Sequence, residues 1–309
     1  MSAEEESFRS WVMTRFGKKL YDVYFGPYTE KLWGCPADEL SADWASQRIT
    51  VPKLTDLVRA TLSPGQNSAR TLVSRFHYPK GGIGRICDAL ADRVSARGAA
   101  LMYSSGPDSI NPLPEGGYSI SVGGKDIEVD GIVSTIPVTD YVKLLGSTLP
   151  DEIHRCSEKL RFRAIVFLVL QLKTGIAAKD HWIYIPEAKY LFNRISIPGN
   201  FDPEVAEHRS QMVFEFTCTE GDDIWSGNLD LLESAVAGGA ELGLFNRDDV
   251  SGSMLARKAH AYPIYSLDYA ENLTAVLDAL DDLDDSVTSG RQGLFRYNNM
   301  DHSLEIGEY

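Results

Sequence analysis

The sequence predicts an α/β protein in which helices alternate with the strands of a mixed sheet. The segment Phe162–Leu172, FRAIVFLVLQL, is apolar on both faces, as the central strand of a sheet is. GGIGRICDALADRVSARG combines a glycine turn with an amphipathic helix, and YSISVGGKDIEV has the alternation of a β-hairpin around Gly123 and Gly124. The fold class is therefore α/β, with a part that is closer to α+β.

The first half of the chain begins with a helical pattern from Glu4 to about Leu32, interrupted at Gly17. We expect a second helix over 55–62 and a strand over 71–79. The helix after the glycine turn places Ile83, Ile86, Leu90 and Val94 on one face, and Gly98 ends it. After the hairpin, a further strand ends at Pro137.

The second half supplies the neighbours of the central strand, namely WIYIP, YLFNRISIP and QMVFEFTCT. A helix near 229–244, a strand near 254–261 and a helix near 269–283 complete the predicted elements. The acidic run DALDDLDD has the composition of a solvated helix end and lacks the ligand spacing of a calcium loop.

Charge and composition exclude several classes of protein. The 309 residues are 43% hydrophobic, which is enough for a sizeable core. A formal charge of -14 argues against general binding of nucleic acid or anionic membranes, although a local basic pocket for a small anion remains compatible with it. No apolar run reaches the roughly 20 residues of a membrane span. The chain has an acidic N-terminus and four cysteines without a CxxC pair, which predicts a cytoplasmic protein in a reducing compartment.

The sequence lacks the usual motifs of several chemistries. It contains no HExxH, GxSxG or P-loop, and its six histidines are scattered. Gly82-x-Gly84 is an incomplete dinucleotide fingerprint, because Cys87 stands where the last glycine belongs. An organic cofactor is the remaining source of chemistry, and no metal site is predicted.

Aromatic and arginine residues recur in four motifs: Tyr28 and Trp33 in YTEKLWG, Arg194 in YLFNRISIP, Tyr262 in HAYPIYS, and Arg291, Arg296 and Tyr297 in GRQGLFRYNNMDHS. Each alone is compatible with ordinary packing. Together they are the residue types that a nucleotide diphosphate requires, because guanidinium forks and tyrosine hydroxyls bind phosphate and flat rings stack on a base.

These motifs resemble those of UDP-galactopyranose mutase, a family within the larger group of FAD proteins that includes flavin amine oxidases and protoporphyrinogen oxidase. The resemblance extends from about Glu6 to Gly307. FGPYTEKLWG and GRQGLFRYNNMD are its most specific parts. YPKGGIGRICDAL and VDGIVSTIP resemble only the flavin-domain elements of the wider group.

The resemblance implies an FAD-dependent enzyme with an anionic substrate, and it assigns roles to individual residues. Tyr28 and Trp33 would hold uracil, and Arg194 and Tyr262 the diphosphate, while flavin N5 attacks the sugar. The implied catalytic residues are Arg194, Tyr262 and Tyr297. The implied contacts to the cofactor come from Gly81, Gly82, Arg291, Asn299 and Met300, and Arg48 is implied as a further substrate contact.

Three departures from the family pattern affect these implications. Asn299 stands where the family has an aspartate, and RITVPKL, from Arg48, replaces an Arg-x-Pro-x-Arg run. The chain also starts after the glycine fingerprint of the family and stops before its last helix. We therefore predict an incomplete Rossmann-type FAD domain interleaved with a substrate domain: a helical substrate-side segment (1–70), a partial FAD domain (71–140), a mixed-sheet substrate domain (141–270) and a return to the FAD domain (271–309).

Three functional hypotheses remain at this stage. The first is a flavoenzyme that acts on a nucleotide-diphosphate sugar. The second is dehydrogenation of another substrate, as in protoporphyrinogen oxidase or amine oxidases. The third is an inactive fragment, or a subunit whose cofactor-binding segment comes from a partner chain. An unpaired sheet edge would be expected in the third case.

Overall fold

The computed structural model describes residues 6–48, 77–202 and 210–308. The helix predicted over 55–62 and most of the strand predicted over 71–79 lie outside these residues. The chain divides into two compact units, Met1–Arg97 with Val166–Arg257 and Gly98–Ile165 with Lys258–Tyr309. The helix at 84–96 thus groups with the first unit. The functional division into cofactor and substrate segments stays a prediction.

The first unit begins with helices that pack around aromatic side chains. They are α1 (Phe8–Leu20), a π-helix (Tyr21–Phe25), α2 (Gly26–Trp33) and α3 (Ala42–Arg48). Phe8 and Trp11 of α1 are buried. The predicted break at Gly17 is confirmed by its φ of 79° and ψ of 162°, which are not helical.

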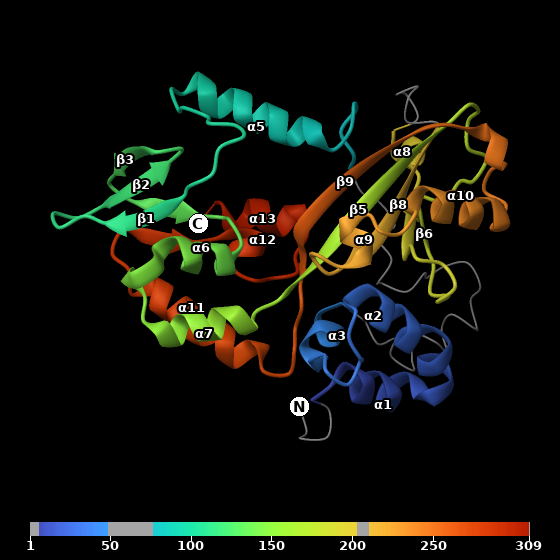
Figure 1. The fold of residues 1–309 in the computed structure, drawn as a ribbon, viewed down its shortest axis with the longest axis horizontal. Coiled ribbons are helices and arrows are strands. Elements are labelled where there is room, and N and C mark those ends of the chain that lie inside the picture. Colours follow the sequence, from blue (N-terminus) through green and yellow to red (C-terminus); the bar gives the residue numbers. More distant parts are fainter. Residues whose placement is uncertain (1–5, 49–76, 203–209, 309) are drawn as a thin grey trace, which may run out of the picture. The chain divides into compact units, whose positions relative to one another are not determined.

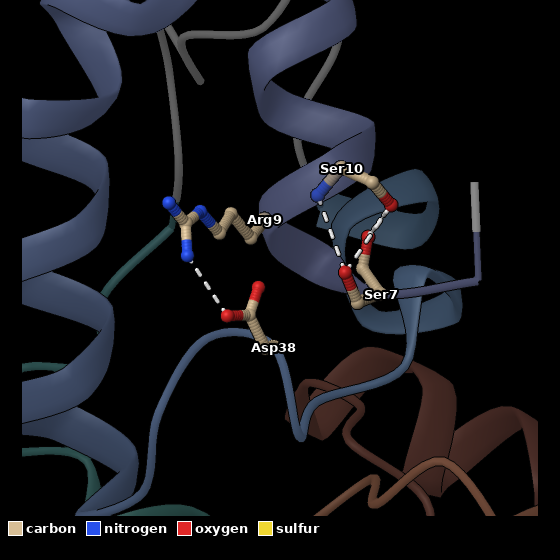
Figure 2. A network of polar contacts seen from close by, with 4 residues as sticks. All are labelled: Ser7, Arg9, Ser10 and Asp38. Atoms are coloured by element: carbon tan, nitrogen blue, oxygen red, sulfur yellow. Dashed lines mark hydrogen bonds and ion pairs between the residues drawn. The ribbon is translucent and has the colours of Figure 1, made fainter. Parts of the chain in front are cut away.

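Polar contacts fix the start of α1 (Figure 2). The Ser10 backbone N–H donates to Ser7 Oγ, which caps the helix. Arg9 Nη1 donates to Asp38 at 2.9 Å, in an ion pair whose two side chains are 46% and 56% exposed. Exposed ion pairs of this kind contribute little to stability, so the cap and the buried rings hold this helix.

A five-stranded sheet follows, with strand order β6-β7-β8-β5-β9 (Figure 1). The prediction of a central strand is confirmed, because β5 lies between β8 and β9 and has the predicted bounds. β5 and β9 each extend into the second unit. The strands are β5 (Phe162–Leu172), β6 (Trp182–Tyr184), β7 (Arg194–Ser196), β8 (Gln211–Cys218) and β9 (Val250–Pro263).

The other helices of the first unit are α5 (Gly84–Ala96), α8 (Pro198–Phe201), α9 (Asp223–Ser226) and α10 (Leu231–Glu241), with a short 3-10 turn at Arg247–Asp249. The prediction of α5 is confirmed, and Gly98 beyond it has a φ of 92°. Its predicted apolar face is not buried among the described residues, since Ile83, Leu90 and Val94 are each more than 40% exposed.

The second unit holds two small sheets. The predicted hairpin is confirmed as β2 (Tyr118–Val122) and β3 (Lys125–Val129), and β1 (Ser109–Pro112) pairs antiparallel with β2. β4 (Ile132–Ser134) and β10 (Ser286–Thr288) form a parallel pair. The helices of this unit are α6 (Val138–Leu145), a 3-10 turn (Gly146–Thr148), α7 (Asp151–Lys159), α11 (Tyr269–Asp281), α12 (Gly290–Gly293) and α13 (Met300–Ile306).

The packing of α7 on α11, and of α6 on α7, forms the core of the second unit. Tyr141 of α6 is fully buried, and its hydroxyl shares a 2.6 Å hydrogen bond with Ser286 of β10. In the described residues, no helix has the length and apolar character needed to cross a bilayer.

Close packing in α10 generates the first prediction. A Cβ at Gly238 would lie 2.7 Å from the ring of Phe192, which is fully buried. Overpacking of this kind costs about 1–3 kcal/mol, so Gly238→Ala should lower the free energy of unfolding despite its better helix propensity. Chemical denaturation measures this, with Leu232→Ala on the exposed side of α10 as the control. An unchanged or higher midpoint for Gly238→Ala would contradict the packing described.

Candidate functional site

Two neighbouring strands, β7 and β8, place an ion pair on one face of the main sheet. Arg194 of β7 lies opposite Glu215 of β8 in the antiparallel register. Its Nε and Nη2 donate to the two carboxylate oxygens of Glu215, each at 2.8 Å. The Glu215 side chain is 4% exposed and the Arg194 side chain is 30% exposed. The carboxylate is therefore buried, whereas the arginine side chain is partly exposed.

The strand register places a tyrosine next to Arg194, in a row of residues that runs across β6, β7 and β8. Tyr184 of β6 is the cross-strand partner of Arg194, and directly opposed residues project from the same sheet face. Tyr28 of α2 meets the Tyr184 ring edge-on, with ring centroids 5.7 Å apart and planes at 85°. Within the first unit, Tyr184 thus has Tyr28 as a ring contact and Arg194 as its register partner.

Lys31 connects α2 to the segment after β6 through hydrogen bonds. Its Nζ donates to the backbone oxygens of Ile185 at 3.0 Å and Glu187 at 2.9 Å. Thr217 Oγ1 also donates to the Lys31 backbone oxygen at 3.0 Å, which joins α2 to β8. Desolvation lowers the pKa of Lys31 to about 8, against an opposing effect of Glu187. These bonds keep Tyr28 beside the sheet.

Trp33, the second ring of the YTEKLWG motif, occupies a different environment. It is 2% exposed and lies edge-on to Trp44, with centroids 5.4 Å apart. Trp44 in turn contacts Phe8 of α1 at 5.2 Å. The ring is part of the helical core of the first unit, and its assignment to uracil stays a prediction.

A second cluster of predicted residues forms in the second unit. The rings of Tyr262 and Tyr297 stack at 5.5 Å with planes 25° apart. The Arg291 guanidinium lies 5.6 Å from the Tyr262 ring centroid and 4.5 Å from that of Tyr297. Arg291 also donates to the backbone oxygens of Asn298 and Ala261. The structure brings these three predicted residues together, and their role in binding a ligand stays a prediction.

The remaining predicted residues lie elsewhere. Gly81 and Gly82 have φ values of 86° and 100°, and the Gly81 N–H donates to buried Asp202 at 2.6 Å. Asn299 and Met300 begin α13 and are exposed; the Asn299 N–H donates to His302 Nδ1. Arg48 ends α3, and its side chain lies outside the described part of the chain.

Polar side chains also meet at the carboxyl ends of β4 and β10. Ser134 and Thr288 are the last residues of the two strands and are register partners. Ser134 Oγ and Thr288 Oγ1 are buried without a hydrogen-bond partner among the described residues. A Cβ at Gly293 would lie 3.2 Å from both the Ser134 backbone oxygen and Thr288 Cγ2. Ligands of open α/β sheets bind at this end of the strands.

Sequence reasoning did not single out Glu215 or Tyr184. Glu215 had the same signal as Arg194, a charge inside the apolar strand QMVFEFTC. Alternation in WIYIP placed Trp182 and Tyr184 on one face, but the sequence could not identify the strand that lies beside them.

Comparison with solved structures shows the fold of this chain. A structure of reduced UDP-galactopyranose mutase matches with a TM-score of 0.85 and 20% identity, over 98% of this chain and 66% of that one. A putative protoporphyrinogen oxidase from Exiguobacterium matches with a TM-score of 0.66 and 14% identity, over 99% of this chain and 68% of the other. Putrescine oxidase matches with a TM-score of 0.63 and 14% identity, over 99% and 66%. The α/β prediction and the resemblance are therefore confirmed at the level of the fold.

Comparison by sequence gives a weaker likeness. Prolycopene isomerase from Daucus carota is 27% identical over an alignment of 195 positions that covers 56% of this chain and 31% of that protein. The chain thus spans about a third of this relative and just under two thirds of the mutase structure. No family model matches the sequence.

The desolvated amine of Lys31 predicts a pH effect on stability. Its folded pKa of about 8 lies below the ordinary value of 10.5, so the unfolded chain binds more protons between these values. Stability should therefore rise with pH across this window, and Lys31→Met should remove that part of the rise. Denaturation midpoints from pH 7 to 10 measure it, with the exposed Lys143→Met as the control. Parallel pH profiles for the wild type and Lys31→Met would contradict this environment.

The ion pair predicts a stability effect at Glu215. Glu215→Gln removes the charge that two donors of Arg194 share. We expect a loss of about 2 kcal/mol, because hydrogen bonds between charged groups contribute more than neutral ones. Ser196→Ala is the control, since its hydroxyl lies 3.4 Å from the same carboxylate. A cost of Glu215→Gln no larger than that of the control would show that the pair does not organise this face.

Proposed function

We propose that the chain is part of an FAD-dependent flavoenzyme that acts on a nucleotide-diphosphate sugar. Three residues support this proposal most directly, because Tyr184 contacts the Tyr28 ring and is the register partner of Arg194. The likeness of the fold to UDP-galactopyranose mutase supports the substrate class. In this proposal Arg194 binds phosphate, and Tyr28 contacts the base.

The residues at the ends of β4 and β10 fit a cofactor. Ser134 Oγ and Thr288 Oγ1 are buried polar atoms that no described residue satisfies, and such atoms are costly without a partner. The absence of a side chain at Gly293 lets the backbone of α12 lie close to these strand ends. We assign this position to the flavin, with Arg291, Asn299 and Met300 as the further contacts that the family resemblance implies, and the roles of Gly81 and Gly82 stay a prediction.

The bound flavin would supply a nucleophile toward the sugar in a mutase, or an electron acceptor in an oxidase. The chain's own residues position and neutralise the substrate. Tyr262 and Tyr297 present stacked rings beside Arg291, and we propose that their hydroxyls donate to the diphosphate or sugar. Arg291 is engaged with two backbone oxygens, so it orients these rings.

Dehydrogenation of a different substrate is the second candidate. The fold likeness to a putative protoporphyrinogen oxidase and to putrescine oxidase favours it. Asn299, in place of the aspartate of the mutase pattern, favours it as well, since it removes one charge beside the tail motif. Hydrogen peroxide made from an amine or porphyrinogen would distinguish this reaction from a sugar rearrangement.

A partner polypeptide is a further proposal, which concerns the second unit. Val133 and Val287 are register partners in the parallel pair β4–β10, and they are 72% and 57% exposed. Parallel strands are normally covered on both faces, so this face lacks its usual cover among the described residues. We propose that a strand-and-helix segment carrying a glycine fingerprint covers it and completes the FAD site, supplied within one polypeptide or by a partner chain.

Turnover tests the proposed function. The chain joined to a glycine-fingerprint segment, with its flavin reduced, should interconvert UDP-galactopyranose and its furanose form. Arg194→Lys should lower kcat/KM about tenfold or more, because lysine lacks the planar fork. Arg257→Lys is the matched control: Arg257 lies on β9, and its Nε donates to the Trp225 backbone oxygen. No change in the sugar, with peroxide formed from another substrate, would refute the mutase proposal and favour the oxidase.

A further inference from the structure

We infer that Tyr184 is the ring on which the nucleotide base stacks, which makes it a specificity-determining residue of the site. The inference rests on the proposed function, because it requires a nucleotide ligand. It concerns a residue outside the motifs that carry the family resemblance. The YTEKLWG motif assigns the base to Tyr28 and Trp33, whereas the structure points to Tyr28 and Tyr184.

Exposure separates the candidate rings. Trp33 is 2% exposed and packed against Trp44, so neither of its faces can receive a base without opening the helical core. Tyr184 is 42% exposed and stands edge-on to Tyr28 at 5.7 Å. Two rings at 85° offer a flat ligand one face for stacking and one edge for lateral contact.

Register places Tyr184 beside the phosphate-binding group. Directly opposed residues of antiparallel strands have Cβ atoms about 5 Å apart, and Tyr184 is directly opposite Arg194. The Arg194 guanidinium is held by two hydrogen bonds to Glu215. A base on Tyr184 therefore carries its diphosphate toward Arg194. A nucleotide diphosphate needs both groups close together, an aromatic ring for its base and a guanidinium for its phosphates.

Trp182 is the natural comparison. It lies two residues before Tyr184 on the same face of β6 and is 43% exposed, close to the 42% of Tyr184. Its register partner is Ser196, which carries no charge, and its ring stacks on Phe201 at 5.6 Å. Trp182 thus matches Tyr184 in strand, face and exposure but lacks the neighbouring guanidinium.

Calorimetric titration of the full chain with UDP and with inorganic pyrophosphate tests the inference. Tyr184→Ala should weaken UDP binding about tenfold, the scale of one lost base–aromatic stack. It should leave pyrophosphate binding within twofold, because pyrophosphate has no base. Tyr184→Phe should bind UDP like the wild type, since the ring remains. Trp182→Ala is the matched control and should leave both ligands unaffected.

The outcomes distinguish the role of Tyr184 from the existence of the nucleotide site. If Tyr184→Ala binds UDP as the wild type does while Arg194→Lys binds it more weakly, the role of Tyr184 is refuted and the nucleotide site stands. Equal losses for UDP and pyrophosphate in Tyr184→Ala would mean that the tyrosine only supports Arg194, and would also refute the inference. If the wild-type chain binds UDP no more tightly than pyrophosphate, the base contributes no affinity, and a base-binding role is refuted for Tyr184 and for every other ring. Failure to bind either ligand refutes the proposed function and this inference together.

Discussion

The paired charges of Arg194 and Glu215 are the constraint on which the candidate site depends. A carboxylate with a 4% exposed side chain would be costly without a partner, and here two guanidinium donors at 2.8 Å meet it. Replacing the pair by apolar residues could preserve the sheet, so stability alone does not account for it. The pair fixes the guanidinium of a partly exposed side chain in one orientation on a strand, as recognition of a phosphate requires.

Hydrogen bonds between α2 and the sheet hold the Tyr28 ring close to Tyr184, the register partner of Arg194. α2 carries Tyr28, and the bonds from Lys31 and Thr217 hold α2 against the segment after β6 and against β8. Edge-on packing with Tyr184 then joins the helix to the row that contains Arg194. The second unit repeats the combination of residue types, with Arg291 beside two stacked tyrosines. Each unit thus holds an arginine with aromatic neighbours.

Local patterns predicted the elements well, whereas contacts between distant segments could not be predicted. The bounds of β5 and the break at Gly17 followed from apolar periodicity and glycine conformation, which are local properties. The burial of Trp33 and the pairing of Arg194 with Glu215 depend on which segments meet, and one sequence does not contain that information. Apolar spacing in α5 predicted a buried face, yet Leu90 is 45% exposed. Periodicity indicates that a helix face is suited to burial, but it does not identify the segment that would pack against that face.

A crystal structure of the chain with bound UDP tests the central claim most directly. The account predicts that the diphosphate lies within hydrogen-bonding distance of the Arg194 guanidinium, that Glu215 still holds this guanidinium, and that the base lies against Tyr184 and Tyr28. A diphosphate bound away from the face that β6, β7 and β8 share would contradict the account. So would a bound state in which Arg194 leaves Glu215 and the base inserts against an opened Trp33.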